Sequence, residues 1–433
     1  MLPVWEKQHL FRPTKRRWRG CRVSPLLILP LLACGCITFT LLRVLLESSA
    51  EPEDAARPDR EVPLPPSLPL SAMTHSDALA AMYAASALGA ARSAAQAAQA
   101  CGQGAIRYTL LAVADQDERA VNHSSGELVS SLLRGTLCDG RDSGGSLSVT
   151  WGDAVPLRSH LAASGRGMEL STLTWFGGRL LSCDDRTGIV YEISKGEARP
   201  RHILAGPTAA AHFKCEWAAV RHGQLYVGGI GRPFHSPSGA TARNDLVATI
   251  DTAGVVSLRN FSAVYDELCR AAGCGRVGYA THEAAAWVGS HGEVGSWYFA
   301  PRRLSSEPFD EALDETRAGR TLLRYSAPGG RDGGHPVSLL SPRSSGLAGA
   351  HVSAVPLGGS SGAADPSRGV SALKLLPGRR DVLVALKTEE SGGRVASFLS
   401  ILRSESGEAL MPDAEVAQGF KFEGLEVSVP TYV

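Results

Sequence analysis

One pattern recurs four times beyond residue 165 and limits what this chain can fold into. Each copy has a polar residue, an apolar run, a glycine-containing turn, a second apolar run and a charged tail. Turn dipeptides such as Gly177-Gly178 and His222-Gly223 are typical of β-hairpins, because glycine adopts the positive φ that tight turns need. The copies are "ELSTLTWFGGRLLSCDDRTG", "CEWAAVRHGQLYVGGIGR", "HEAAAWVGSHGEVGSWYFAPRR" and "VSALKLLPGRRDVLVALKTEES". The pattern predicts an all-β fold.

A lone apolar run lies at each end of this series, "IRYTLLAVADQDE" before it and "FKFEGLEVSV" after it. Repeated four-stranded units with an unpaired strand at each end favour a propeller closed by its two termini. At roughly 65 residues a unit, residues 104–433 would form about five blades with long loops between them. The periodicity alone is equally compatible with a β-sandwich or a two-domain β protein.

Polar side chains stand just before the first apolar run of each copy. They are Glu169 with Ser171, then Glu216, Glu283 and Ser371; the final run adds Glu423, and the opening run ends in Asp115 and Asp117. Taken singly, each glutamate is explained as a surface residue at the end of a strand. The recurrence of the position in unit after unit instead indicates that these side chains meet at a common centre.

Carboxylates that converge on one axis need a cation. Two of them 4 Å apart repel by about 4 kcal/mol at an effective dielectric constant of 20. Carboxylate and hydroxyl oxygens favour a hard metal, Ca²⁺ before Mg²⁺. The chain contains no CxxC pair, so its sequence does not suggest zinc. A net charge of +1 argues against general nucleic-acid binding.

The N-terminus has the charge pattern of a signal anchor. Residues 1–22 hold seven Lys and Arg side chains against one acid, and an uncharged run from Val23 to Leu42 follows. As a helix, such a run reaches about 30 Å, enough to cross a membrane. We predict a cytosolic tail at 1–22, a type II transmembrane helix at 23–46 and a lumenal remainder, with a cleaved signal peptide as the alternative.

Residues 47–103 change from Pro-rich to Ala-rich sequence and are predicted to form a stem, with a helix docked on the domain as the alternative. A lumenal location is consistent with N-x-S sites at Asn122 and Asn260 and with six cysteines beyond the anchor. We expect Cys269 to pair with Cys274 and, next, Cys101 with Cys138. Cys183 and Cys215 are predicted to be buried and unpaired.

An ordered set of motifs between Ile106 and Val427 resembles the calcium-activated nucleotidase (apyrase) family. The set is "GRGMELS", "DDRTG", "EWAAV", "YVGG", "HEAAAW", "APRR", "VALKTEESGGRVAS" and "FEGLE". The resemblance implies a five-bladed propeller with one central Ca²⁺ that hydrolyses nucleoside di- and triphosphates. The predicted anchor is similar to that of the membrane-bound Golgi members, which prefer UDP and GDP.

The resemblance also implies roles for individual residues. The calcium positions carry over to Ser171, Glu216, Glu283, Ser371 and Glu423, the set that the repeats indicate apart from Glu169. Asp115 and Asp117 match the family's paired acids and, with Glu169, are predicted to orient or deprotonate the attacking water. The predicted phosphate-binding side chains are Arg302 first, with Arg186 and Lys387, while Asp184 and Asp185 would line the mouth beside the substrate. We hold Arg303 to be a solvated charge.

The chain departs from the family pattern in places. Thr172 stands where an acid is common, and Cys215 where alanine is usual. The stretch "GVSALKLLP" is less aromatic and less Ser-rich than its counterpart, and residues 233–249 lack an expected tryptophan. The last difference leaves the preferred base open.

Three functions are compatible with these observations. The first is a Ca²⁺-dependent nucleoside diphosphatase of the Golgi or endoplasmic reticulum that supports glycosylation by removing UDP or GDP. The second is a non-catalytic lumenal binding propeller. The third is a secreted or surface apyrase that scavenges ATP and ADP. Monomer and homodimer are equally compatible with the sequence.

Overall fold

The structure is a computed structural model that describes residues 101, 104–122, 125–161, 166–208, 211–235, 241–289, 295–326, 351–358 and 365–428. The predicted cytosolic tail, the transmembrane helix and, apart from Cys101, the stem lie outside these residues. Among the helices within the described ranges, none has the length and apolar character that crossing a membrane requires.

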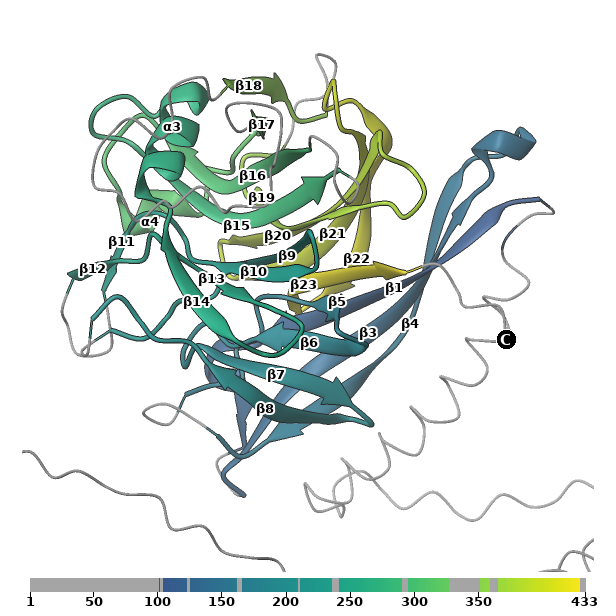
Figure 1. Ribbon diagram of the computed structural model, residues 1–433. Helices are drawn as coiled ribbons and strands as arrows, with labels where there is room; N and C mark the ends of the chain where they lie inside the picture. Colours follow the sequence, from purple (N-terminus) through teal and green to yellow (C-terminus); the bar gives the residue numbers. More distant parts are fainter. Residues whose placement is uncertain are drawn as a thin grey trace, which may run out of the picture. The chain divides into compact units, whose positions relative to one another are not determined.

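The described chain is predominantly β-strand and forms five four-stranded antiparallel groups (Figure 1). Group A is β23 (Lys421–Ser428), β1 (Ile106–Asp115), β3 (Glu127–Asp139) and β4 (Leu147–Ser159). Group B is β5 (Thr174–Phe176), β6 (Arg179–Cys183), β7 (Ile189–Ser194) and β8 (Glu197–Ile203). Group C is β9 (Trp217–Arg221), β10 (Gln224–Gly228), β13 (Leu246–Ile250) and β14 (Val256–Asn260). Group D is β15 (Tyr279–Val288), β16 (Ser296–Ser305), β17 (Thr321–Ser326) and β18 (His351–Pro356). Group E is β19 (Arg368–Leu375), β20 (Val382–Ser391), β21 (Arg394–Arg403) and β22 (Ala409–Gln418).

Short elements complete the described part. They are η3 (Asp117–Ala120), β2 (Val121–Asn122), η4 (Arg141–Ser143), the hairpin β11 (Pro233–His235) and β12 (Thr241–Arg243), α3 (Ser262–Ala272) and α4 (Glu311–Asp314). A single parallel bridge, Arg158 to Glu197, joins groups A and B, and together with β2, which pairs with β3, they form one nine-stranded sheet.

The two lone runs of the sequence pair with each other. β1 and β23 are antiparallel neighbours from Thr109 opposite Ser428 to Asp115 opposite Lys421. The last strand thus completes the group that the first strand begins, as the sequence predicts.

The innermost strands of the five groups touch one another in a closed series. β5 contacts β9, β9 contacts β15, β15 contacts β19, β19 contacts β23, and β23 returns to β5. Figure 1 shows the groups following one another in chain order around these strands. Side chains at corresponding positions of the five inner strands therefore lie near a common centre.

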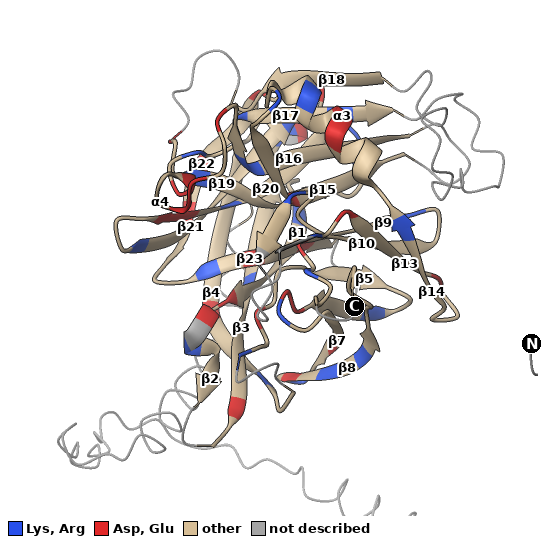
Figure 2. Ribbon diagram, turned by 90° about the vertical axis from the view of Figure 1, so that its left-hand side faces the viewer, with Lys and Arg blue, Asp and Glu red and all other residues tan. Residues whose placement is uncertain are grey.

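Burial separates inner strands from outer ones. Every residue of β15 except Val288 is buried, and its centre is the small-residue run Ala284, Ala285 and Ala286. The outer strands β8, β14 and β22 contain exposed residues, and Figure 2 shows charged residues along the ribbon of β8. Small inner residues let the groups approach closely. At Gly424, an added Cβ would lie 2.5 Å from the carbonyl carbon of Thr172, so this inner position of β23 requires glycine.

Three disulfides connect the described cysteines. Cys101 pairs with Cys138 and Cys269 with Cys274, which confirms both predicted pairs. The prediction that Cys183 and Cys215 are unpaired is wrong, because these two form the third disulfide. They are 32 positions apart in sequence but meet where groups B and C pack together. Three disulfides in one domain are typical of proteins that fold in the oxidising secretory pathway.

The two predicted glycosylation sites lie on strands. Asn260 ends β14, is exposed, and accepts a hydrogen bond at Oδ1 from the backbone N of Ser262 (2.8 Å). This leaves the side-chain nitrogen, the atom that a glycan would occupy, outside that bond. Asn122 ends β2, and the two residues that complete its motif lie outside the described ranges.

Candidate functional site

The five predicted metal ligands each belong to a different group. Ser171 lies just before β5 and Glu216 just before β9, while Glu283, Ser371 and Glu423 lie within β15, β19 and β23. All five are buried, with exposed fractions between 1% and 9%. The recurring polar position in the sequence is therefore a recurring position in space.

β-bulges determine where three of these side chains point. The pairing of β15 with β16 is interrupted at Glu283, that of β19 with β20 at Ser371, and that of β23 with β1 at Glu423. A bulge inserts an unpaired residue and redirects its side chain from the regular alternation. The bulges thus free these three side chains from the alternation of their strands.

The three glutamates form a compact cluster. One carboxylate oxygen from each of Glu216, Glu283 and Glu423 lies within 4.8 Å of the others. Ser171 and Ser371 line one small cavity together with Glu283, with room for about one water molecule. This cluster and the two hydroxyls are called the central set below.

Burial makes the charged form of two central carboxyls, those of Glu216 and Glu423, unfavourable. It raises the pKa of Glu216 to about 8, against the opposing effect of Lys214 and with a further contribution from Glu283. Burial likewise raises the pKa of Glu423, although Lys421 and Arg302 oppose it. Ionising these acids so close together and away from water costs free energy, and a bound divalent cation would offset that cost.

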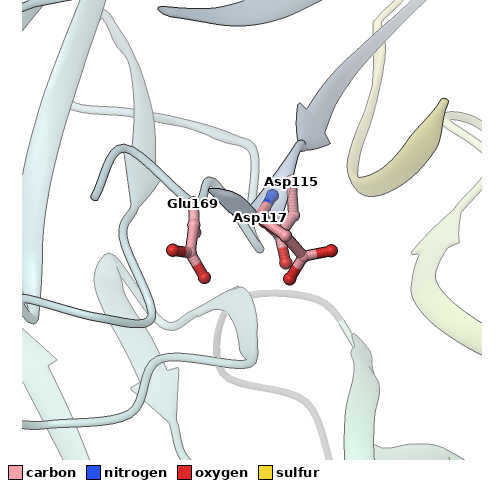
Figure 3. A group of neighbouring side chains, drawn as sticks. All are labelled: Asp115, Asp117 and Glu169. Atoms are coloured by element: carbon pink, nitrogen blue, oxygen red, sulfur yellow. The ribbon is translucent and has the colours of Figure 1, made fainter. Parts of the chain in front are cut away.

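A second acidic cluster lies at the end of β1 and contains the three residues predicted to be catalytic. Carboxylate oxygens of Asp115, Asp117 and Glu169 lie within 4.8 Å of one another, and Figure 3 shows Glu169 approaching the two aspartates from a separate segment. The backbone N of Asp117 donates to Asp115 Oδ1 (2.9 Å). Arg166 donates to both oxygens of Glu169, each at 2.9 Å, and so fixes the plane of that carboxylate.

The three acids differ in how readily they ionise. Burial, with Asp115 and Asp185 nearby, raises the pKa of Glu169 to about 8. Burial also opposes ionisation of Asp115, but Lys421, whose Nζ lies 2.5 Å from Oδ2, outweighs it and lowers the pKa. The pKa of Asp117 is raised by burial and by Asp115. Glu169 thus combines near-neutral titration with a fixed orientation.

Three cations pair with the acids of the site: Arg302 and Lys421 are buried, and Lys214 is partly exposed. Nη1 of Arg302 lies 2.6 Å from both Glu283 Oε2 and Glu423 Oε1, and Nη2 pairs with Glu390. Lys421 pairs with acids of both clusters, and Lys214 pairs with Glu216 (2.9 Å) and with Asp185. Sequence reasoning missed Lys214, Lys421, Arg166 and Glu390.

Comparison with known proteins identifies the kind of protein that carries this arrangement. The family model described as Apyrase matches residues 114–328 and 354–428. The chain is 36% identical over 329 residues to Soluble calcium-activated nucleotidase 1 of Rattus norvegicus, covering 75% of this chain and 74% of the rat protein. The protein of that name from Mus musculus matches with the same identity and coverage. Apyrase apy-1 of Caenorhabditis elegans is 33% identical over 273 residues, 62% of this chain and 69% of the worm protein.

The chain belongs to the apyrase family. Both clusters lie within the matched residues, because the matched ranges begin at residue 114 and run through residue 428.

The remaining predicted site residues occupy different surroundings. Asp184 is fully buried and accepts hydrogen bonds from the backbone N of Met168 (3.0 Å) and of Arg186 (2.8 Å), and burial with Asp185 nearby raises its pKa to about 7. Asp185 is also buried and pairs with Lys214. These aspartates therefore hold the segment that carries Glu169 and do not line an open mouth.

The cations considered for phosphate binding differ in their exposure and in whether a carboxylate of the protein already pairs with them. Arg186 is partly exposed, and no carboxylate of the described chain lies within ion-pair distance of its guanidinium. Lys387 pairs with Asp413 (2.6 Å) inside group E. Arg303 is buried, not solvated as predicted; it donates to the carbonyl oxygen of Ser367 (3.1 Å).

Replacing Arg302 with methionine should strongly destabilise the protein when no divalent cation is present. The change leaves Glu283 and Glu423 without their shared cation, and removing one partner of a buried ion pair costs about 3 kcal/mol or more. Denaturant unfolding in a chelator measures the loss. Arg403→Met, which removes an exposed pair on β21, is the control. A loss below about 1 kcal/mol for the Arg302 variant would show that the pairs contribute little.

Proposed function

We propose that this protein is a Ca²⁺-dependent nucleotidase that hydrolyses nucleoside diphosphates, UDP and GDP preferentially, and also triphosphates. The products are the nucleoside monophosphate and phosphate. One observation carries the proposal: five oxygen-bearing residues, one from each sheet group, gather at a common centre beside a cluster of three further acids. Membership of the apyrase family and the name of the rodent relatives support the reaction and the metal.

We take the fold to be a five-bladed β-propeller. Each sheet group corresponds to one blade, and pairing of β1 with β23 closes the series. The mutual contacts of the five inner strands support this interpretation.

The central set fits calcium. Its donors are all oxygens, three from carboxylates and two from hydroxyls, and neutral oxygens with a few carboxylates are the ligands that Ca²⁺ takes. Burial, together with the nearby Glu283, raises the pKa of Glu216 despite Lys214, and a bound cation would favour the charged form of this carboxyl. When bound, Ca²⁺ would supply charge that offsets the negative oxygens of a phosphoanhydride.

Residues of the second acidic cluster would orient and activate the water molecule that attacks the phosphate. A general base works best with a pKa near the operating pH, and Glu169 is the acid of its cluster whose pKa is placed there, at about 8. Arg166 holds the Glu169 carboxylate in one orientation, and Asp115, kept ionised by Lys421, would accept a hydrogen bond from the same water. Asp117, whose side chain is about half exposed, would accept a hydrogen bond from this water on the side that faces solvent.

Arg186 is the first candidate for binding the phosphates. Its side chain is partly exposed, and a guanidinium can donate two parallel hydrogen bonds to the oxygens of a phosphate. Arg302, which pairs with Glu283 and Glu423 of the central set, would face the phosphate nearest the metal. Lys387 is left out of this proposal because Asp413 engages its ammonium group.

We further propose a Golgi or endoplasmic reticulum location, with residues 23–46 as a type II anchor and the described part in the lumen. The three disulfides and the exposed Asn260 support a lumenal location. Removing UDP or GDP that glycosyltransferases release would there support glycosylation.

Phosphate release by the purified full-length protein tests this function. UDP, GDP, ADP and ATP are each supplied with Ca²⁺, Mg²⁺ or EGTA. The proposal predicts calcium-dependent release that is fastest with UDP or GDP. A preference for ATP and ADP would support a secreted scavenger, and no release from any nucleotide would refute the proposed reaction.

Without divalent cations, the protein should lose stability as the pH rises from 6.5 to 8. Glu169 and Glu216 titrate near pH 8 in the folded chain, above the ordinary value of a glutamate, so the folded state binds more protons than the unfolded state in this window. The free energy of unfolding then falls with pH, by at least about 1 kcal/mol. Denaturant unfolding in EGTA at several pH values measures this fall. Calcium should abolish it; a stability in EGTA that stays constant or rises would contradict the assignment.

A further inference from the structure

The disulfide between Cys183 and Cys215 joins two sheet groups that no strand pairing connects in the described chain. Cys183 ends β6 of group B, and Cys215 lies two residues before β9 of group C. Both are buried, in an apolar cluster to which the two groups contribute Leu181 and Leu225 among others. The bond is therefore an internal covalent connection between neighbouring groups.

Each cysteine is in immediate contact with a residue of the central set. Cys215 directly precedes Glu216 in the chain. The carbonyl oxygen of Cys183 accepts a hydrogen bond from the backbone N of Ser171 (3.0 Å). The backbone N of Cys183 donates to Thr172 Oγ1 (2.9 Å), so the hydroxyl that replaces the family's usual acid is used to hold this segment.

A second link joins the same two segments. Lys214, one residue before Cys215, forms an ion pair with Asp185, two residues after Cys183. The ammonium of Lys214 also lies 2.9 Å from Glu216 Oε1, so the ion pair and the disulfide both act on the segment that presents Glu216. An ion pair can reorganise when a metal ion binds, whereas a disulfide keeps the two segments of the chain joined.

We propose that the Cys183–Cys215 disulfide is a positioning element for the calcium site. It holds Glu216 and Ser171, which belong to different groups, at the separation that one ion requires. Ligands held in place before binding lose less conformational freedom on binding and so bind more tightly. This inference rests on the proposed function, because it takes calcium to be the ion of the central set.

A double variant, Cys183→Val with Cys215→Ala, tests the inference in the full-length protein. Both new side chains are apolar and suit the buried cluster. Calcium binding is measured by isothermal titration calorimetry, and the melting temperature is measured in EGTA. We expect the calcium dissociation constant to rise about tenfold to a hundredfold, the range for residues that support metal ligands from behind. At saturating calcium, kcat should return to within about twofold of the wild-type value, since the bound ion then holds the ligands.

The matched control is Cys269→Ala with Cys274→Ala. It removes the disulfide at the end of α3, whose cysteines neither adjoin nor bond to residues of the central set. This variant should lower the melting temperature without changing the calcium dissociation constant. If the Val/Ala pair fails to fold, Cys183→Ala with Cys215→Ala, which adds no volume, takes its place.

The outcomes separate the two proposals. A Cys183/Cys215 variant with a lower melting temperature but wild-type calcium affinity would show that the bond only stabilises the fold, and would overturn this inference alone. Wild-type protein that binds no calcium would overturn the proposed function, and this inference with it. Weaker binding in this variant but not in the control supports the positioning role.

Discussion

Glu216→Gln should abolish activation by calcium at concentrations that saturate the wild-type protein. The substitution keeps the shape of the side chain but removes one of three buried carboxylates whose oxygens lie within 4.8 Å of one another. Residues that only support metal ligands cost up to about a hundredfold in affinity when changed, so loss of a charged ligand should cost at least that much. A calcium titration of phosphate release measures the shift in half-saturation.

Glu408→Gln is the control for this prediction, because Glu408 is an exposed acid near β22 that pairs with Arg403 at the surface. It should leave the titration unchanged. An unaltered calcium dependence in Glu216→Gln would remove this residue from the proposed metal site. The variant should also be more stable than the wild type in EGTA at pH 8, since it has one fewer buried carboxyl to ionise.

Glu169→Gln should lower kcat by about a hundredfold or more while calcium still binds. An amide keeps hydrogen bonds within the cluster but cannot accept the proton of a water, and general-base catalysis contributes about 10²–10⁴ in rate. The pKa of about 8 places this group where a base works at neutral pH, and bound calcium would lower that value by adding positive charge nearby. Steady-state kinetics at saturating calcium, with calorimetry on the same preparation, separate catalysis from metal binding.

Glu197→Gln, on the outer strand β8, is the matched control and should show wild-type kinetics. A Glu169→Gln enzyme with wild-type kcat would transfer the role of base to Asp115 or Asp117. If calcium binding were lost instead, Glu169 would belong to the metal site and not to the catalytic cluster.

The central set was predictable because it depends on repetition. Ser171, Glu216, Glu283, Ser371 and Glu423 occupy the same place in successive hairpin units, and a closed series of inner strands converts equal places in sequence into neighbours in space. The bulges at Glu283, Ser371 and Glu423 were not predictable, because the register of a strand depends on its partner as well as on its own residues.

Lys214 and Lys421 were missed although the sequence holds a signal for both of them. Lys214 and Lys421 each follow a phenylalanine and each stand two residues before a glutamate of the central set, in "FKCE" and "FKFE". Each lysine pairs with that glutamate and with an aspartate of another segment: Lys421 with Asp115 at the end of β1, and Lys214 with Asp185 two residues after β6. The repeat of this short motif could have revealed them.

The third disulfide was missed for a different reason. Cys183 and Cys215 both lie in apolar surroundings, which is typical of buried free cysteines. What brings them together is the packing of group B on group C, a contact between side chains that neither strand pattern encodes. The sequence feature that the two cysteines share is their position: each directly precedes an acid, Asp184 or Glu216.

Locating the ion tests the central claim most directly. Crystals of the protein grown with Ca²⁺, or with Sr²⁺ for a stronger anomalous signal, would show where a divalent cation binds. We expect one anomalous peak at the centre of the five sheet groups, surrounded by oxygens of Glu216, Glu283 and Glu423 with the hydroxyls of Ser171 and Ser371 facing it. A peak at Asp115, Asp117 and Glu169 instead, or none at the centre, would contradict it.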